Sequence, residues 1–192
     1  KFKLKTLENI DVYDKFESIC QLNINRIDSL KDVYFNGIIS EVISDDARLL
    51  TKGIGSKKKL QDESVDLILT SPPYAGAQKY IRSSWLNLYW LGTKNSEDIR
   101  LLNKQNIGRE DYHKADMFRV STNIQAADDV LTSLYDEGKN ERAFIVGNYL
   151  NEMKSAIDES VRVLKTGGYM IIVIGNNTVC GRPFDTQDYL TT

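Results

Sequence analysis

The sequence predicts an α/β fold in which a mostly parallel sheet is flanked by helices. Three short apolar runs carry this prediction, at residues 38–43, 65–70 and 169–174, because they are rich in Val, Ile and Leu. Runs of this length with few polar breaks are typical of parallel strands that are buried on both faces. The stretches between them have apolar residues at helical spacing, and this alternation favours a parallel sheet.

The predicted helices precede, separate and follow these strands. One or two N-terminal helices are predicted by the spacing of Phe16, Ile19, Cys20, Asn23, Ile27 and Leu30. A second stripe consists of Ile81, Trp85 and Leu88. Residues 143–146 fit either a fourth strand or the start of the next helix. That helix has its apolar face at Leu150, Met153, Ile157, Val161 and Leu164, and it ends at a Lys-Thr-Gly-Gly sequence, residues 165–168.

The composition predicts a single globular domain in the cytoplasm. Of the 192 residues, 41% are apolar and 27% are charged, and no apolar stretch approaches the roughly 20 residues that cross a bilayer. The first residues also lack the apolar core of a secretory signal. We interpret Cys20 and Cys180 as free thiols, because they show no metal-ligand spacing, and we expect no metal. The chain starts at Lys1 and stops within an apparent helix start, so we expect a domain that is incomplete at both ends.

The residues with the clearest chemistry follow the run at 65–70 directly. They read Ser71-Pro72-Pro73-Tyr74, and ligands of open α/β sheets bind at the carboxyl ends of the strands. Proline fixes φ and has no N–H, so this turn offers rigid carbonyl groups that only accept hydrogen bonds. Tyr74 adds a flat surface on which a ring can stack.

This combination favours a planar base held by its exocyclic amino group. The amino nitrogen of cytosine or adenine is a poor nucleophile, because its lone pair is delocalised into the ring. Acceptors around it draw its hydrogens out of the plane and localise the lone pair. We assign the Ser71 hydroxyl oxygen and the Pro72 carbonyl as these acceptors, with Tyr74 stacked on a flipped-out base. Catalysis is then alignment and electrostatics without a covalent intermediate.

Three further segments accompany the motif: residues 42–49 with Asp-Ala-Arg, residues 162–168 with Arg-Val-Leu-Lys-Thr-Gly-Gly, and residues 174–177 with Gly-Asn. In this order they resemble the amino-methylating DNA methyltransferases, whose motif reads Asp/Asn/Ser-Pro-Pro-Tyr/Phe/Trp. The resemblance covers most of the chain. It implies a Rossmann-like methyltransferase fold, with residues 1–192 as part of a catalytic domain. It also implies transfer of a methyl group from S-adenosylmethionine to DNA.

The resemblance also implies which residues bind the cofactor. Asp46 lies near its adenine by this match, and Ala47, Thr70, Ser71 and Asn176 join it. The glycine-rich loop of the family, Phe-x-Gly-x-Gly, has no counterpart, because a charged loop follows the glycines at 53 and 55, which we interpret as a turn. We expect that loop before Lys1, so a missing N-terminal segment or a second chain would complete the cofactor site.

Double-stranded DNA is the partner that the resemblance implies. The formal charge is −2, so DNA binding needs a local basic face. We predict that Lys79, Arg82 and Arg109 contact DNA. Residues 93–138 are polar and weakly periodic, and we interpret them as an insertion that either contacts DNA or is mobile. His113, the single histidine, lies in this segment and is interpreted as a surface residue.

Several alternatives stay open. Ser71 favours N4 of cytosine over N6 of adenine, because the adenine enzymes more often have Asp there. Methylation of a glutamine side chain usually accompanies Asn at this position. C5 methylation of cytosine is disfavoured, because neither Cys20 nor Cys180 follows a proline. Outside enzymes, the chain fits a non-catalytic DNA-recognition or assembly subunit that has lost the cofactor loop. Pairing with a restriction nuclease, in a restriction-modification system, accords with the enzyme interpretation.

Overall fold

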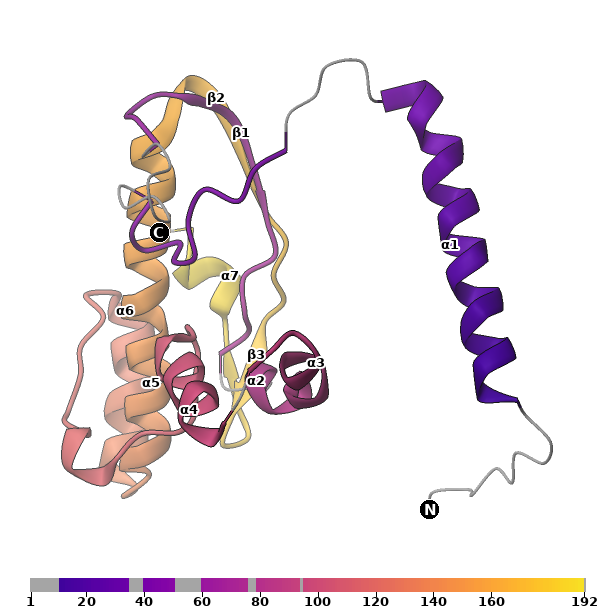
Figure 1. The fold of residues 1–192 in the computed structure, drawn as a ribbon. Coiled ribbons are helices and arrows are strands. Elements are labelled where there is room, and N and C mark those ends of the chain that lie inside the picture. Colours follow the sequence, from indigo (N-terminus) through magenta and orange to yellow (C-terminus); the bar gives the residue numbers. More distant parts are fainter. Residues whose placement is uncertain (1–10, 35–39, 51–59, 76–78, 94, 192) are drawn as a thin grey trace. The chain divides into compact units, whose positions relative to one another are not determined.

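A computed structural model describes residues 11–34, 40–50, 60–75, 79–93 and 95–191 of the chain (Figure 1). It divides into two units, Lys1–Val42 and Ile43–Thr192. The first contains α1, Val12–Tyr34. The Asp11 carboxylate accepts hydrogen bonds from the backbone N–H groups of Tyr13 (2.9 Å) and Asp14 (3.2 Å), which caps the first turn. The N-terminal prediction of one or two helices is therefore confirmed as one long helix.

The second unit contains a parallel pair of strands, as the sequence predicts. β1, Val65–Thr70, pairs with β2, Leu164–Ile172, with Ile68 opposite Met170 and Thr70 opposite Ile172. The long helix α6, Asn140–Val163, leads directly into β2 (Figure 1). Residues 143–146 belong to this helix, so the second of their two interpretations is confirmed. The fold is thus a mixed α/β arrangement whose described parallel sheet has two strands.

Two strand predictions are wrong. The predicted strand at 38–43 has no strand at its described residues 40–43, and residues 38 and 39 lie outside the described part. The strands are also not buried on both faces, because Leu67 and Leu69 of β1 and Tyr169 and Ile171 of β2 are exposed. Their partners on the other face, such as Ile68, are half-buried. A local apolar pattern favours a strand without showing which neighbours cover it.

The remaining elements are short, apart from two helices within residues 93–138. In chain order they are α2 (Tyr80–Ser83), α3 (Trp85–Trp90), α4 (Ser96–Gln105), the 3-10 turn η1 (Lys114–Asp116), α5 (Gln125–Asp136), the antiparallel strands β3 (Asn177–Val179) and β4 (Arg182–Phe184), and α7 (Thr186–Tyr189). No helix of the described residues combines the length and apolarity needed to cross a membrane.

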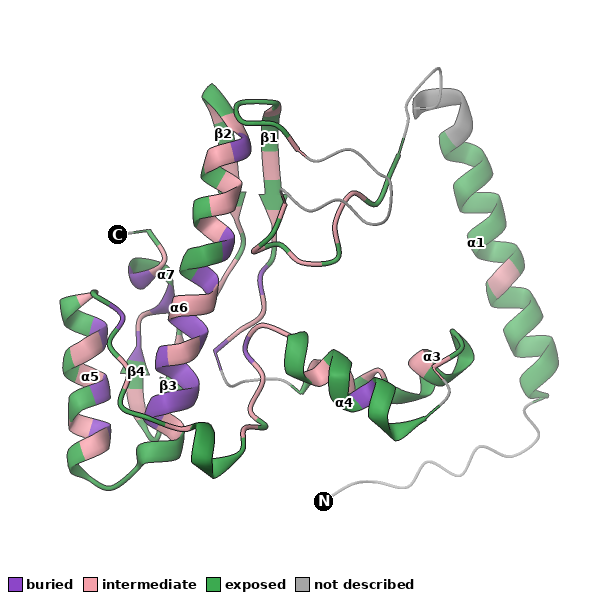
Figure 2. Cartoon of the chain, turned by 60° about the vertical axis from the view of Figure 1, so that its left-hand side comes forward, coloured by how far each residue is buried: buried purple, intermediate pink, exposed green. Residues whose placement is uncertain are grey.

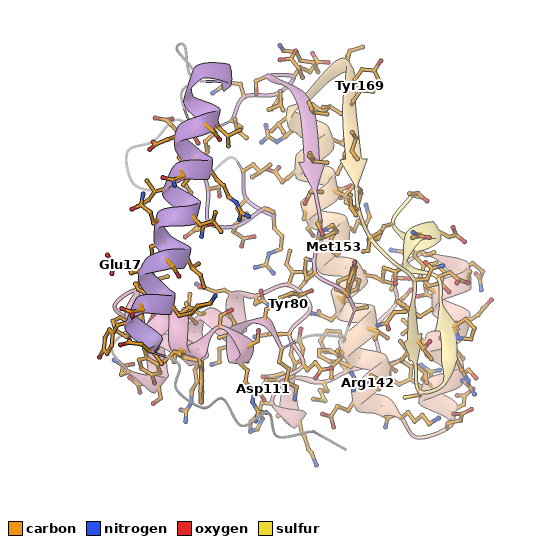
Figure 3. All side chains as sticks on the ribbon, turned by 90° about the vertical axis from the view of Figure 1, so that its right-hand side faces the viewer. Glu17, Tyr80, Asp111, Arg142, Met153 and Tyr169 are labelled. Atoms are coloured by element: carbon orange, nitrogen blue, oxygen red, sulfur yellow. The ribbon has the colours of Figure 1, made fainter. Side chains whose placement is uncertain are left out.

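The hydrophobic core lies where α5 and α6 pack on each other and on the β3–β4 hairpin. Buried positions line the facing sides of both helices (Figure 2). Its members are Ala75, Ala127, Leu131, Leu134, Ala143, Val146, Tyr149, Leu150, Met153, Val179, Phe184 and Tyr189. The polar segment 93–138 therefore supplies core residues through α5. Figure 3 shows Met153 midway along the unit, with Tyr169 at one end and Arg142 and Asp111 at the other.

Candidate functional site

The Pro-Pro turn, residues 71–75, begins where β1 ends. The pairing of β1 with β2 continues up to the start of the turn, since the Val173 N–H donates to the Thr70 carbonyl at 2.9 Å. Pro72 and Ala75 are buried, whereas Ser71 is exposed. The sequence prediction that this motif follows a strand of a parallel sheet is thus confirmed. The turn lies at the carboxyl end of that strand, where α/β folds bind their ligands.

Side chains from three other elements hold the backbone of the turn. The Tyr149 hydroxyl of α6 donates to the Pro73 carbonyl at 2.8 Å. The Tyr74 N–H donates to the Tyr80 hydroxyl of α2 at 3.2 Å. The Asn177 side-chain amide of β3 donates to the Ala75 carbonyl. Within the described part of the chain, no hydrogen bond engages the Ser71 hydroxyl or the Pro72 carbonyl. These are the two acceptors that the sequence assigned to an amino group.

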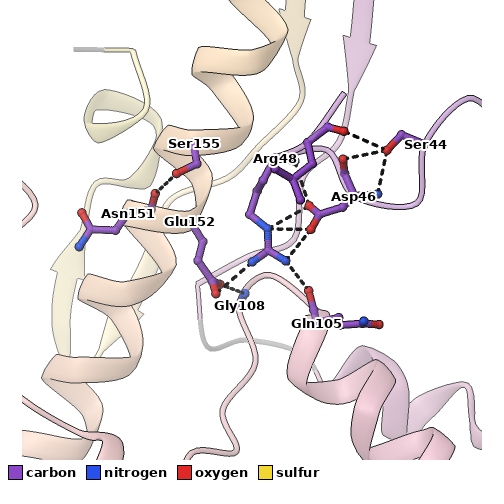
Figure 4. A network of polar contacts seen from close by, with 9 residues as sticks. Ser44, Asp46, Arg48, Gln105, Gly108, Asn151, Glu152 and Ser155 are labelled. Atoms are coloured by element: carbon purple, nitrogen blue, oxygen red, sulfur yellow. Dashed lines mark hydrogen bonds and ion pairs between the residues drawn. The ribbon is translucent and has the colours of Figure 1, made fainter. Parts of the chain in front are cut away.

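A polar network fixes the segment that contains Asp46 (Figure 4). The Arg48 guanidinium donates to both Asp46 carboxylate oxygens, at 2.9 Å each, and to the Gln105 carbonyl at 2.9 Å. Its third nitrogen donates to Glu152 of α6 at 3.2 Å. The hydrogen bond from Arg48 lowers the pKa of Asp46. A carboxylate that stays ionised and is fixed in this way is a preorganised acceptor.

Glu152 ties this network to the loop that follows α4. Its second carboxylate oxygen accepts a hydrogen bond from the Gly108 N–H at 3.4 Å (Figure 4). Burial raises the pKa of Glu152, although Arg48 opposes the shift. One carboxylate on α6 therefore connects two segments that are far apart in the sequence, and both of them border the cavities that follow.

The Asp46 cavity, of about 530 Å³, opens beside this network. Its polar lining includes Asp45 and Asp46, and Ala47 and Pro73 also border it. The rest of its wall is largely apolar and comprises Leu49, Ile81, Leu102 and Ile107, together with Gln105 and Asn106. Predicted cofactor residues thus meet a residue of the Pro-Pro turn. Apolar walls with a few acceptors suit a flat heterocycle that carries an amino group.

The α2–α4 cavity, of about 440 Å³, is a separate space. It brings together Lys79, Arg82 and Arg109, which the sequence predicted as DNA contacts. The remaining wall combines aromatic, cationic, amide and acidic side chains, namely Tyr80, Trp85, Arg100, Asn103, Asn106, Glu110, Asp111 and Glu141, with Ile81 and Ile99. Ile81 and Asn106 border both cavities, so the two spaces share a wall next to Tyr80 and the turn.

Arg109 is the most constrained cation of this cavity. Its guanidinium lies 4.1 Å from the centre of the Tyr112 ring, a cation–π geometry. Its buried Nε has no hydrogen-bond partner among the described residues. The Tyr112 hydroxyl accepts a hydrogen bond from Asn148 at 2.7 Å, and burial raises the pKa of Tyr112. The guanidinium is therefore held against the Tyr112 ring at the wall of the cavity.

Other predicted positions lie apart from these cavities. Asn176 is engaged at α7, because its side chain contacts Asp185 at 3.3 Å and accepts a hydrogen bond from the Gln187 N–H at 3.0 Å. Its neighbour Asn177 reaches the turn instead. The exposed His113 accepts a hydrogen bond from the backbone of η1 through Nδ1. The glycines at 53 and 55 lie outside the described residues.

Three residues that build the site could not be assigned to it from the sequence. Tyr149, Glu152 and Asn177 contact the Pro-Pro turn or its surroundings from distant positions in the chain, whereas Tyr80 lies only six residues after Tyr74. The apolar stripe of α6 includes the neighbours of Tyr149 but gives no signal for its hydroxyl. Glu152 lies between Asn151 and Met153 and resembles any charged residue on a helix surface.

Comparisons of the chain with models of protein families, with curated proteins and with solved structures gave no match.

Proposed function

We propose that this chain carries the catalytic part of an S-adenosylmethionine-dependent DNA methyltransferase with a Rossmann-like fold, which methylates the N4 amino group of a flipped-out cytosine. One observation carries the proposal. The Pro-Pro turn is anchored through its flanking backbone groups, while the Ser71 hydroxyl and the Pro72 carbonyl are engaged by no described residue. Two unengaged acceptors on a rigid backbone suit an amino group that has two hydrogens to donate.

The Asp46 cavity fits the adenosine part of the cofactor. Asp45 and Asp46 supply acceptors for an adenine amino group, and the apolar wall suits the faces of its ring. When bound, S-adenosylmethionine supplies an electrophilic methyl group. The chain's own residues then orient the base: Ser71 and Pro72 accept hydrogen bonds from its amino group, and Tyr74 stacks on its ring. The amino hydrogens stay on the nitrogen, hydrogen-bonded to these acceptors, during the transfer, and the methylated amino group then releases its extra proton to solvent water.

The α2–α4 cavity supports double-stranded DNA as the partner. Arg82 and Arg109 supply positive charge for phosphate groups, and Lys79 joins them although it pairs with Glu110 at 3.5 Å. Trp85 supplies an aromatic surface on which an unstacked base can lie. A base that enters for methylation leaves its stack. The cavity's shared wall with the Asp46 cavity supports a short path between base and cofactor. The two free thiols accord with a cytoplasmic location.

The test uses the protein with labelled S-adenosylmethionine and double-stranded DNA of mixed sequence. The DNA is digested to nucleosides, and the labelled nucleoside is identified. We expect N4-methylcytosine, and we expect its loss in Ser71→Ala and in Tyr74→Ala. Ser155→Ala and Tyr13→Ala serve as controls of the same residue types, because both residues are exposed and lie outside the Pro-Pro turn and the two cavities.

Each other outcome changes a defined part of the proposal. Labelled N6-methyladenine would keep the mechanism and replace the base. Label in protein rather than in DNA would move the substrate to a glutamine side chain. DNA binding without any label, by protein that binds the cofactor, would make the chain a recognition subunit. Equal loss of label in the control variants would remove the role of Ser71 and Tyr74.

A further inference from the structure

Tyr149 lies in the core helix α6, and its hydroxyl holds the peptide group between Pro73 and Tyr74. We propose that Tyr149 is a positioning residue: its hydroxyl fixes the peptide plane between Pro73 and Tyr74 and thereby aims the Pro72 carbonyl at the substrate amino group. This inference rests on the proposed methyl transfer for its chemistry, whereas the geometry that it claims is a property of the chain alone.

Two hydrogen bonds fix the same peptide unit. The Pro73 carbonyl accepts from Tyr149 at 2.8 Å, and the Tyr74 N–H donates to Tyr80 at 3.2 Å. These are the two polar groups of one planar amide. The carbonyl and the N–H of one amide point in opposite directions. An amide that is hydrogen-bonded at both groups therefore cannot rotate about the line between its two Cα atoms without breaking a hydrogen bond. The donor hydroxyl of Tyr149 comes from α6 and the acceptor hydroxyl of Tyr80 from α2, so the plane is fixed from two sides.

The proline rings pass this constraint on to the Pro72 carbonyl. The ring of Pro73 fixes φ near −65°, so only ψ of Pro73 separates the plane of the Pro72 carbonyl from the anchored plane. Neither Pro72 nor Pro73 has an N–H through which another group could hold its peptide. On the other side, the Thr70 carbonyl is held by the sheet at 2.9 Å. The orientation of the Pro72 carbonyl therefore depends most directly on the anchored plane between Pro73 and Tyr74, because the dihedral angles of Ser71 and Pro72 separate it from the Thr70 carbonyl.

Tyr149 is well suited to this task because the core leaves it no freedom. Its side chain is 0% exposed, and a Cβ built on Gly108 would lie 3.3 Å from its ring. Burial strongly raises the pKa of its hydroxyl, so the group stays a donor. Tyr149 belongs to the lining of neither described cavity. Removing the Tyr149 hydroxyl therefore tests positioning without removing a contact to cofactor or DNA. Tyr80→Phe would not separate the two effects, because Tyr80 lines the α2–α4 cavity.

Tyr149→Phe removes the hydroxyl and keeps the ring, and Tyr135→Phe is the matched control. The Tyr135 hydroxyl also donates to a backbone carbonyl, that of Phe118, at 3.3 Å, and accepts from the Val120 N–H at 3.1 Å. Both variants lose a tyrosine hydrogen bond to the backbone within the same unit. Only Tyr149 contacts the turn, so a general loss of stability affects both variants and a loss of positioning affects one.

The first readout needs no ligand. The chain has three prolines, namely Pro72, Pro73 and Pro183, so labelling with carbonyl-¹³C proline gives three NMR signals that proline substitutions assign. We expect Tyr149→Phe to shift the Pro73 signal and to shift or broaden that of Pro72, while Pro183 stays unchanged. Tyr135→Phe should leave Pro72 and Pro73 unchanged. An unchanged Pro72 signal in Tyr149→Phe, or the same change in both variants, would overturn the inference.

The second readout is steady-state methylation. We expect Tyr149→Phe to lower kcat by roughly 10- to 100-fold, the size expected when a reacting group is misplaced by up to 1 Å, with KM for DNA and cofactor within about twofold, as expected for alignment in the transition state. Loss confined to KM, or an equal loss of kcat in Tyr135→Phe, would contradict positioning. If the unsubstituted protein transfers no methyl group, the proposed function fails. The NMR signals of the proline carbonyls then still decide whether Tyr149 orients the turn.

Discussion

Gly108, in the loop after α4, lies against the anchored turn, and Gly108→Ala tests the stability of this contact. Its φ is +76°, a left-handed conformation that side chains rarely adopt. A Cβ there would lie 3.3 Å from the Tyr149 ring and 3.6 Å from the Tyr74 carbonyl oxygen. The substitution therefore adds backbone strain and presses on the residue that holds the Pro-Pro turn.

The two costs can be estimated and separated. An alanine in the left-handed region costs about 1–2 kcal/mol. Overpacking a full core adds roughly 1–3 kcal/mol, near the low end here because only one contact is tighter than usual. We therefore expect Gly108→Ala to lower the free energy of unfolding by about 2–3 kcal/mol. Gly138→Ala is the control, because Gly138 has φ +74° and no atom within 4 Å of an added Cβ, so it carries the strain alone, about 1–2 kcal/mol.

Urea unfolding followed by circular dichroism measures both variants. A midpoint change at constant slope reports stability alone. We expect the loss in Gly108→Ala to exceed that in Gly138→Ala by about 1 kcal/mol. The combination Gly108→Ala with Tyr149→Phe should show non-additivity, because the two side chains touch. Equal losses in the two glycine variants, together with strict additivity, would refute the claim that Gly108 packs against the anchor of the turn.

Three further predictions concern stability and pH. In Gly168→Ala, an added Cβ would lie 3.0 Å from a backbone carbonyl of β1, so we expect a loss of about 1–3 kcal/mol in urea unfolding, and only a small change in Gly175→Ala, which has open space. Burial raises the pKa of Glu152 above 4.5, so stability should fall as pH rises through the interval just above 4.5, and Glu152→Gln should flatten that part of the profile. Burial alone would raise the pKa of Asp128, but hydrogen bonds from Thr122 and its neighbours lower it below 3.8. Stability should thus be lost as pH falls through that lowered pKa, and less so in Asp128→Asn.

The strand at 65–70 and the Pro-Pro turn at its end could be predicted because both signals are local. The strand is a run of apolar residues with one break, and the prolines exclude a helix after it. The exposure of Leu67 and Leu69 could not be predicted, since it depends on how many strands flank β1 and what covers them. The run at 38–43 failed for a related reason: β-branched residues favour strands only where a partner strand is present.

The segment 93–138 contains a core helix, α5, that its polar composition made hard to predict. In α5, Ala127, Leu131 and Leu134 are buried, and their spacing by three and four residues is that of a helix face. Asp128 and Asp129 lie between Ala127 and Leu131, and Thr132 and Ser133 lie between Leu131 and Leu134, so the helix has a polar outer face. The spacing of the few apolar residues therefore carries more structural information here than their number.

The Pro-Pro turn could be predicted from the sequence, but the residues that make it rigid could not. Tyr149 lies 76 positions from Pro73 and Asn177 lies 102 positions from Ala75, and nothing distinguishes Tyr149 from the other tyrosines, of which the chain has ten in all. A motif of two prolines removes the local N–H donors that would otherwise order its backbone. The rigidity of the turn must therefore come from side chains of other elements. A chain that kept the two prolines but lost these side chains would still have the acceptor groups, but their orientation would no longer be fixed.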